Sequence, residues 1–346
     1  MKSTSIFLLR AICVLSLTIF ICSSALPQTP TPQPSPATGE KKPEMSEAEA
    51  KEANAINNEP DAAAKLAAAE RFLKKYPKSG ARQEMARYVA GQIAGVTDAT
   101  QKVTLAESFR KTFTAENEQD FIQPVILDAY FAANRTEEAF KLGTSVLAKE
   151  PEHVGVLTQL AIAGTEEAKK RNPKYVTQSA QYGMKAIELI EANKKPARMD
   201  EQTFTTIKEM LPHLYQSMGI LSMASGNEAE GRPRFEKAST LNPTDPFNYV
   251  MLGSIVDNEY QQAAEKYKAM PEGPQKAEAL KNAQALMDKA IEYYARAVAT
   301  SEGRAEYQKL HDQVLQDMTP YYKYRHGGST EGLQQLIDKY KVQPKP

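Results

Sequence analysis

The chain has 346 residues, which is enough for two average domains or for one elongated array of repeats. Lys and Arg together number 43, and so do Asp and Glu, so no strong field of either sign argues for nucleic acid or anionic lipid as a partner. The hydrophobic fraction is 41%, the mean hydropathy is −0.52, Trp is absent and Gly numbers only 17. These values exclude a polytopic membrane protein, a disulfide scaffold and a wholly disordered chain, and they disfavour a β-rich fold.

Residues 1–25 have the pattern of a cleaved export signal. Lys2 and Arg10 give a positive start, Ala11 to Ile21 form an apolar stretch, and Ser23 and Ala25 supply the small residues of a signal-peptidase site. A bilayer span takes about 20 apolar residues, and Arg10 interrupts any longer run. We therefore expect an exported protein, periplasmic or secreted, with no membrane span after cleavage; an uncleaved anchor is the less favoured alternative.

The two cysteines, Cys13 and Cys22, both lie in this signal. Cleavage after Ala25 would leave a mature chain with no disulfide, no thiolate nucleophile and no cysteine-ligated metal. A lipid anchor on Cys22 is a further alternative, which the bulky Ile21 disfavours because lipoprotein signals have a small residue there.

Residues 26–45 contain six prolines and almost nothing to bury, so we predict a disordered, extended linker. A proline-rich recognition ligand is the alternative. The last residues, 342–346, are predicted to be a disordered tail.

Residues 46–341 are predicted to be an all-α domain built from a series of helices. Apolar residues recur at three- and four-residue spacing through this region. Prolines separate the successive helical patterns, at Pro77, Pro151, Pro196, Pro212, Pro243 and Pro271.

One stretch, 212–245, has the clearest repeat-like pattern. An aromatic residue is followed by a Gly, a Gly-Asn turn and then an aromatic, an Ala and a Pro: these are Tyr215, Gly219, Gly226-Asn227, Phe235, Ala238 and Pro243. This pattern resembles the tetratricopeptide repeat, a helical hairpin in which small residues at positions 8, 20 and 27 let the two helices approach and a Pro at position 32 ends the second. The resemblance implies an α-solenoid of helical hairpins, some of them with lengthened or inserted helices.

Three further units fit less closely. The unit at 120–151 has Ile126-Leu127, Tyr130 and Ala139 in place, but Gly143 stands where a large residue is expected. The next unit, from Val154, places Leu160-Ala161 on positions 7 and 8 and Ala180, Met184 and Ile187 on positions 20, 24 and 27. A fourth begins at Pro246, with Tyr249, Leu252-Gly253, Ala290, Tyr294 and Ala297 on repeat positions and the helical insertion 258–285 between them.

The two ends of the domain also have helical patterns. The stretch 71–79 looks like the end of the second helix of a repeat. Near the C-terminus we predict a last hairpin with helices at 310–325 and 331–341, in which the tyrosines of 321–324 are core and packing residues.

The sequence shows no motif for enzymatic chemistry or a cofactor. The four histidines, His153, His213, His311 and His326, have no paired metal-ligand spacing, and no phosphate-binding glycine loop or nucleophile elbow is present. Asn134-Arg135-Thr136 is formally a glycosylation sequon, but we expect it only to make a turn. We predict no cofactor, no metal and no catalytic residue.

In tetratricopeptide repeats, peptide contacts come mostly from positions 2, 5, 9, 12 and 13 of the first helix. The residues that clamp a C-terminal carboxylate in some members are missing here, which disfavours an adaptor for chaperone tails. The resemblance therefore implies a mixed concave surface for an extended or helical protein segment, although several of its aromatics can equally pack between repeats. Its candidate residues are Phe121, Asp128, Phe131, His213, Gln216, Ile220, Phe247, Ser254, Asp257 and Asn258, with Pro124, Ala132, Val250, Met223 and Ala224 on further matching positions.

The sequence as a whole favours an exported, non-enzymatic scaffold that binds protein partners in the cell envelope. One alternative is an all-α envelope enzyme acting on polysaccharide, which would need two carboxylates facing one deep cleft. Another is an accessory factor for outer-membrane assembly or secretion, which only the stretch 71–79 favours.

Overall fold

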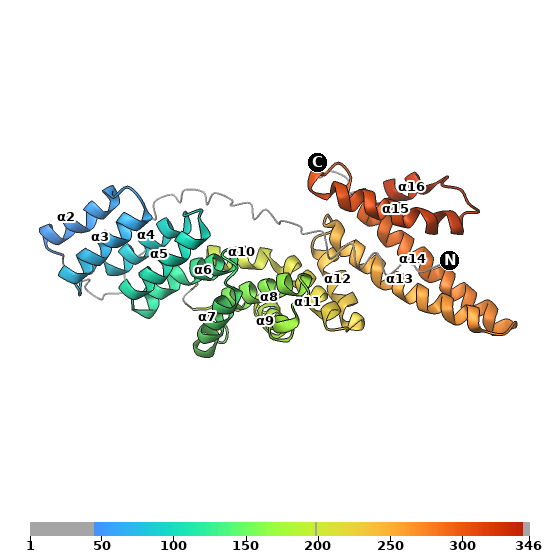
Figure 1. Cartoon of the computed structure of the whole chain (residues 1–346), viewed down its shortest axis with the longest axis horizontal. Coiled ribbons are helices and arrows are strands. Elements are labelled where there is room, and N and C mark those ends of the chain that lie inside the picture. Colours follow the sequence, from blue (N-terminus) through green and yellow to red (C-terminus); the bar gives the residue numbers. More distant parts are fainter. Residues whose placement is uncertain (1–44, 198, 342–346) are drawn as a thin grey trace. The chain divides into compact units, whose positions relative to one another are not determined.

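The computed structural model describes residues 45–341 except Arg198, and within this part of the chain every regular element is a helix (Figure 1). The predicted all-α class is confirmed. The predicted signal, most of the linker and the tail lie outside the described residues. Between residues 45 and 341, no helix is both long and apolar enough to cross a membrane.

The described residues divide into two compact units, an N-terminal unit of residues 45–160 and a C-terminal unit of residues 161–341. The N-terminal unit contains α2 (Glu47–Ala55), η1 (Ile56–Asn58), α3 (Ala62–Lys75), α4 (Arg82–Ala94), α5 (Ala99–Thr112), α6 (Glu116–Ala132), α7 (Thr136–Lys149) and the start of α8 (Val154–Lys169). The C-terminal unit continues with η2 (Pro173–Tyr175), α9 (Val176–Glu191), α10 (Glu201–Glu209), α11 (Leu211–Ala224), α12 (Glu228–Leu241), α13 (Pro246–Ala269), α14 (Pro274–Ser301), η3 (Ala305–Tyr307), α15 (Gln308–Arg325) and α16 (Leu333–Asp338).

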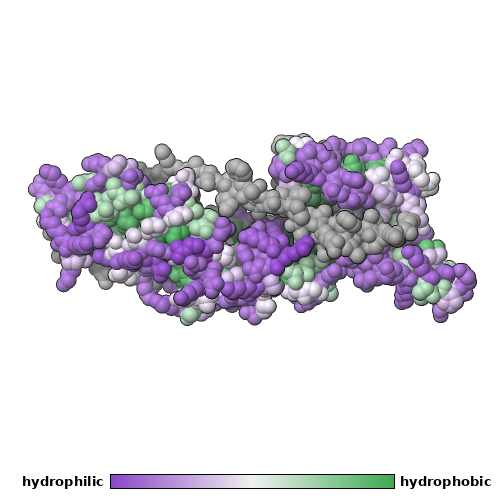
Figure 2. Space-filling view, viewed as in Figure 1, coloured by the Kyte–Doolittle hydropathy of each residue, from purple (hydrophilic) through white to green (hydrophobic). Residues whose placement is uncertain are grey.

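Helix starts in the N-terminal unit follow local capping chemistry. The carboxylates of Asp61 and Asp98 accept hydrogen bonds from the Ala64 and Gln101 amides, at 2.8 and 2.7 Å, where α3 and α5 begin. The interior of this unit is aromatic and aliphatic: Phe109 and Phe113 stack with ring centroids 4.5 Å apart and are fully buried. The surface that Figure 2 shows over this unit is largely hydrophilic, with small apolar patches between helices.

Two glycines of the C-terminal unit show why the predicted repeat register is correct. A Cβ added at Gly219 of α11 would lie 2.7 Å from Cζ of Phe235 on α12, and one added at Gly253 of α13 would lie 2.5 Å from Cε1 of Tyr294 on α14. In each hairpin an aromatic ring occupies the space that a glycine leaves open, so the two helices approach closely. The same glycine–aromatic pair therefore recurs in two successive hairpins.

The predicted insertion at 258–285 is helical and lengthens both helices of its hairpin. The 24-residue α13 and the 28-residue α14 pack along each other on either side of the predicted turn at 271–274 (Figure 1). Gly273 in this turn has φ +158°, which favours glycine.

The predicted register of the hairpin from Val154 is wrong by one residue in its second helix. Met184 was expected at the helix interface, but its side chain is 43% exposed. Gly183 takes that place instead, since a Cβ added there would lie 3.2 Å from that of Ala161, and Ser179 packs against Gly164. The smaller residues face the partner helix because only they allow this close approach.

In the N-terminal unit, Gly143 also lies at a close contact. A Cβ added to it would lie 2.6 Å from Cδ1 of Leu160. The Leu160 side chain of α8 therefore fills the space in which a large side chain at position 143 was expected. Asn134 makes the turn between α6 and α7 as expected, with φ +56°.

The last hairpin differs from its prediction in two details. Its second helix, α16, is shorter than 331–341 because Gly332, with φ +85°, cannot belong to a right-handed helix. Tyr322 is buried as predicted, but Tyr324 is 63% exposed and so is not a packing residue.

Candidate functional site

The first candidate site is a surface of the N-terminal unit to which three helices contribute. The Arg87 guanidinium of α4 lies over the ring of Phe121 on α6, 5.1 Å from the ring centroid. On α6, Asp128 accepts a hydrogen bond of 2.9 Å from the side-chain amide of Gln159 on α8, and the Pro124 carbonyl accepts a weaker one of 3.4 Å from the same amide. We call Arg87, Phe121, Pro124, Asp128 and Gln159 the α6 surface.

The α6 surface remains open to solvent although its side chains contact one another. Phe121 is half-buried, and Pro124 and Asp128 are exposed. The surrounding protein nevertheless raises the pKa of the Asp128 carboxyl, while the Gln159 hydrogen bond and the charge of Lys102 act in the opposite direction.

Phe131, predicted to contribute to this surface, is engaged elsewhere. Its ring meets the buried ring of Phe140 edge-on at 6.2 Å, so it packs within its own hairpin. Ala132 beside it is exposed.

Five candidates of the C-terminal unit are buried, so they do not lie on an open concave surface as predicted. Gln216 donates hydrogen bonds to Asp245 at 2.7 Å and Asn248 at 3.1 Å, between α11 and the start of α13. Ile220 belongs to an apolar cluster with Phe235 and Leu252. The first helices of these hairpins pack against the next hairpin along the face that was expected to be open. The five buried candidates are Gln216, Ile220, Val250, Ser254 and Asp257.

The remaining candidates are partly exposed. Phe247 packs against the apolar cluster around Ile220. Asn258 donates a hydrogen bond of 3.2 Å to Glu228. Burial, together with the charge of Lys169, lowers the pKa of His213, while the charges of Glu166 and Asp245 act in the opposite direction.

A polar cluster that the sequence did not predict lies between α13 and α15. The Tyr321 hydroxyl donates to Asp257 Oδ1 at 2.9 Å, and the Gln261 side-chain amide lies 3.3 Å from the same oxygen and 3.1 Å from the Tyr321 hydroxyl. Asp317, one turn before Tyr321 on α15, and Tyr294 of α14 complete what we call the Asp257 cluster. The only sequence signal is a pair of i, i+4 spacings, 257 with 261 and 317 with 321, on helices far apart in the chain.

Electrostatics couples the members of the Asp257 cluster. Burial raises the pKa of Asp317, and the charge of Asp257 raises it further. Burial also raises the pKa of Tyr321 and of Tyr294, and Asp257 adds to both shifts. Asp257 thus contributes to the raised pKa of all three groups, Asp317, Tyr321 and Tyr294.

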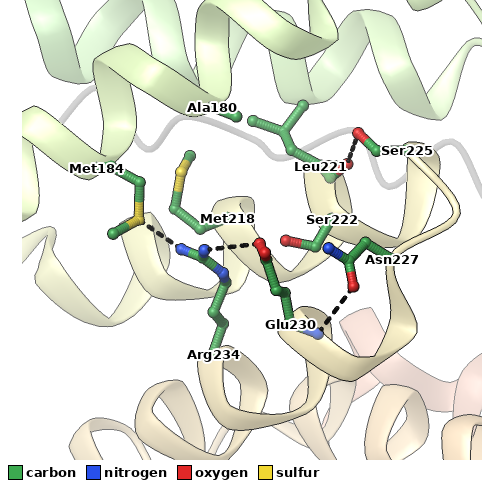
Figure 3. Close-up of a pocket in the computed structure, with 9 residues that line it drawn as sticks. All are labelled: Ala180, Met184, Met218, Leu221, Ser222, Ser225, Asn227, Glu230 and Arg234. Atoms are coloured by element: carbon green, nitrogen blue, oxygen red, sulfur yellow. Dashed lines mark hydrogen bonds and ion pairs between the residues drawn. The ribbon is translucent and has the colours of Figure 1, made fainter.

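A small pocket opens between α9, α11 and α12 (Figure 3). The Arg234 guanidinium reaches across it to the Met184 sulfur and to Glu230, with 3.3 Å between Arg234 Nη2 and the Glu230 carboxylate. Its volume of about 100 Å³ is well below the several hundred Å³ typical of small-molecule sites. A second hollow, about 290 Å³, lies around Glu49 and the turn after α3. Neither hollow brings two carboxylates together, as the polysaccharide-enzyme alternative would require.

Among residues 45–341, no three His, Cys, Asp or Glu side chains lie close enough to hold a metal ion. The histidines found there have local roles. His153 accepts from the Val156 amide at the start of α8, and His326 stacks on Tyr322 with ring centroids 3.9 Å apart at the end of α15.

Comparison with solved structures gives a distant likeness. No family model and no curated protein matches the sequence. A crystal structure of a tetratricopeptide repeat protein from Parabacteroides merdae is similar over 78% of this chain and 98% of its own, with 15% sequence identity and a TM-score of 0.38. That protein is of the family that the sequence pattern resembles. At this TM-score the likeness carries no argument about function, and the repeat architecture rests on the helix contacts described above.

Proposed function

We propose that this protein is an exported, non-enzymatic helical-repeat scaffold that binds a segment of another protein on its α6 surface. One observation carries the proposal: side chains of α4, α6 and α8 contact one another on a single solvent-exposed surface. Arg87 contacts Phe121, and Asp128 contacts Gln159. Repeat proteins bind partners on surfaces to which successive units each contribute.

The chemistry of the α6 surface suits a polypeptide rather than a small metabolite. An aromatic ring beneath a guanidinium provides an amphipathic contact, and Pro124 adds apolar area. The Asp128 carboxylate and the Gln159 amide provide an acceptor and a donor for main-chain or polar side-chain groups. A surface that alternates apolar and hydrogen-bonding groups is typical of sites for extended or helical segments.

Export is part of the proposal, and it rests on the pattern of residues 1–25. Sequencing the N-terminus of the protein recovered from envelope fractions tests it directly. A mature terminus close to residue 26 supports export, and a protein that stays in the cytoplasm with Met1 intact would contradict it.

Partner binding is tested with a photo-crosslinking amino acid placed at position 128 in cells, followed by mass spectrometry of the adducts. The matched control places the same amino acid at Lys149, an exposed position near the end of α7. We expect a short, reproducible set of envelope proteins from position 128 only, reduced by Phe121→Ala. Identical adducts from both positions, or none from position 128, would contradict a binding role for this surface.

A further inference from the structure

We infer that Met184 is a site of oxidative modification, at which a peroxide converts the thioether to a sulfoxide and Arg234 binds the added oxygen. The site lies in the C-terminal unit, on α9 and α12. It therefore depends neither on the α6 surface nor on the proposed function.

The Met184 thioether is accessible to a dissolved oxidant. In α9 the small Gly183 faces the partner helix, and Met184 beside it is 43% exposed. Met218 lines the same pocket but is only 1% exposed. Because oxidation of methionine follows exposure, a peroxide is expected to react with Met184 and to leave Met218 reduced.

Arg234 of α12 places a charged donor beside the Met184 sulfur. Its guanidinium directs Nη1 at Met184 Sδ, while Nη2 lies 3.3 Å from the Glu230 carboxylate (Figure 3). A thioether sulfur is a weak hydrogen-bond acceptor, so Nη1 has a poor partner as long as Met184 is reduced. A sulfoxide oxygen is a polar acceptor, and hydrogen bonds from a charged donor are the strong ones. Glu230 can stay bound, because it contacts the other guanidinium nitrogen.

The pocket beside Met184 has room for the added atom. Its volume is about 100 Å³, whereas a space of about 10–15 Å³ already admits a water molecule. Ser222, Asn227 and Glu230 are among its lining residues, so an oxygen that enters the pocket meets polar neighbours. Oxidation at Met184 therefore does not force a polar group into the apolar core.

The chemical step is the transfer of one oxygen atom from hydrogen peroxide. A lone pair of the Met184 sulfur attacks a peroxide oxygen, so that a sulfur–oxygen bond forms and the oxygen–oxygen bond breaks. The hydroxide that leaves takes the proton of the transferred hydroxyl, and the products are the sulfoxide and water. The sulfur loses two electrons and the peroxide gains them.

The sulfoxide adds a polar contact between two hairpins. Met184 lies on α9 and Arg234 on α12, which belong to different hairpins. Oxidation elsewhere in a protein turns an apolar side chain into a polar one and disrupts packing. At Met184 the hydrogen bond from Arg234 offsets this loss.

The first measurement is peptide mapping by mass spectrometry, after the full mature protein has been treated with hydrogen peroxide. The reference is Met45, which is also 43% exposed but whose sulfur contacts the Ser79 hydroxyl, at 3.9 Å, instead of a charged donor. We expect Met184 to gain one oxygen atom at a rate within about threefold of that of Met45, and at least about tenfold faster than Met218. A Met184 that stays reduced while Met45 is oxidised would overturn the inference.

The second measurement shows whether Arg234 binds the product. Melting temperatures before and after peroxide are compared for the wild type, Met184→Leu, Arg234→Leu and the double variant. Each comparison with and without Met184 isolates the effect of oxygen on this residue, because the other methionines are the same in both proteins. We expect oxidation of Met184 to lower the melting temperature by at least about 2 °C more in the Arg234→Leu background than with Arg234 present. An equal loss in both backgrounds would overturn the binding of the sulfoxide by Arg234.

Met184→Gln tests the same contact without an oxidant. Glutamine has a similar length and offers an amide oxygen to Arg234, whereas Met184→Leu offers no acceptor. Arg234→Leu is expected to lower the melting temperature of Met184→Gln by at least about 2 °C more than that of Met184→Leu. If Arg234→Leu lowered both melting temperatures equally, the role given to Arg234 would be wrong.

Discussion

Gly219 provides the sharpest test of the repeat packing. A Cβ at this position would lie 2.7–2.8 Å from three carbons of the Phe235 ring, which is fully buried and cannot move into solvent. Alanine in place of glycine within a helix gains about 1 kcal/mol of helix propensity. Overpacking of a well-filled core costs about 1–3 kcal/mol, so Gly219→Ala is expected to lose up to about 2 kcal/mol net and Gly219→Leu about 3 kcal/mol or more.

Gly91 of α4 is the matched control for Gly219. It also lies within a helix, but a Cβ added to it would meet nothing within 4 Å. Gly91→Ala is therefore expected to stabilise the protein by about 0.5–1 kcal/mol, so that the same substitution has opposite signs at the two positions.

Thermal unfolding followed by far-UV circular dichroism measures both effects. For a unit of this size about 1 kcal/mol corresponds to a shift of roughly 2–4 °C in melting temperature. Adding Phe235→Leu to Gly219→Ala is expected to recover part of the loss, with a coupling of about 0.5–3 kcal/mol. An unchanged melting curve for Gly219→Leu would refute the packing that places α11 against α12.

Three further predictions concern charged and titrating groups. Arg82→Ala is expected to lower the free energy of unfolding by about 3–5 kcal/mol, because it leaves the buried Glu118 carboxylate without the guanidinium that contacts it at 3.1 Å. Chemical denaturation measures this loss, and a loss below about 1 kcal/mol would contradict the expectation. Burial and a hydrogen bond to Glu191 raise the pKa of Tyr215 to about 12. In an alkaline titration, the phenolate absorbance of Tyr215 is therefore expected to appear at higher pH than that of a free tyrosine. The stability that the neutral phenol contributes below pH of about 10 is lost as the pH rises towards 12. Glu191→Gln is expected to shift this late titration to lower pH, and an unshifted curve would contradict the assignment. Because burial raises the pKa of Asp317, its charged form opposes folding at neutral pH. Asp317→Asn is therefore expected to raise the melting temperature at pH 7, and this gain is expected to disappear below pH of about 3.9. If the variant and the wild type melted at the same temperature at pH 7, the raised pKa would be absent.

The features of the fold that sequence could predict depend on spacings within one hairpin. Gly219 and Phe235 are 16 residues apart, as are the matching positions of the repeat pattern, and the structure confirms their contact. The lengthened α13 and α14 follow from continuous periodicity around the Pro-Glu-Gly-Pro turn at 271–274. Such signals are local, because both partners of each contact lie in one short helix pair.

The register of α9 shows where a local signal is ambiguous. Ser179 and Ala180 are both small, so the sequence allows two alignments that are offset by one residue. The choice is made by Ala161 and Met218, which lie in the neighbouring helices and close on Gly183. Helix α10, which lies between Pro196 and Pro212, has a weak local signal, because only Phe204 and Ile207 of this short element are buried.

The candidate sites were less predictable than the fold. Phe121 and Asp128 were named from the repeat positions, but their partners Arg87 and Gln159 come from other hairpins. Asp257 was expected to face a partner, and the structure instead buries it beneath Tyr321, 64 residues later. Repeat positions specify which face of a helix a residue occupies, and they do not specify whether the next hairpin covers that face.

Buried polar groups in the C-terminal unit fall into two kinds. The Gln216 amide is satisfied by both Asp245 and Asn248, so this network is explained by holding α11 and α13 in one register. The Asp257 cluster is equally buried but leaves the Tyr294 hydroxyl without a partner among the described residues. Register alone does not explain that hydroxyl, because a phenylalanine would fill the same space against Gly253 without the cost of an unpaired oxygen.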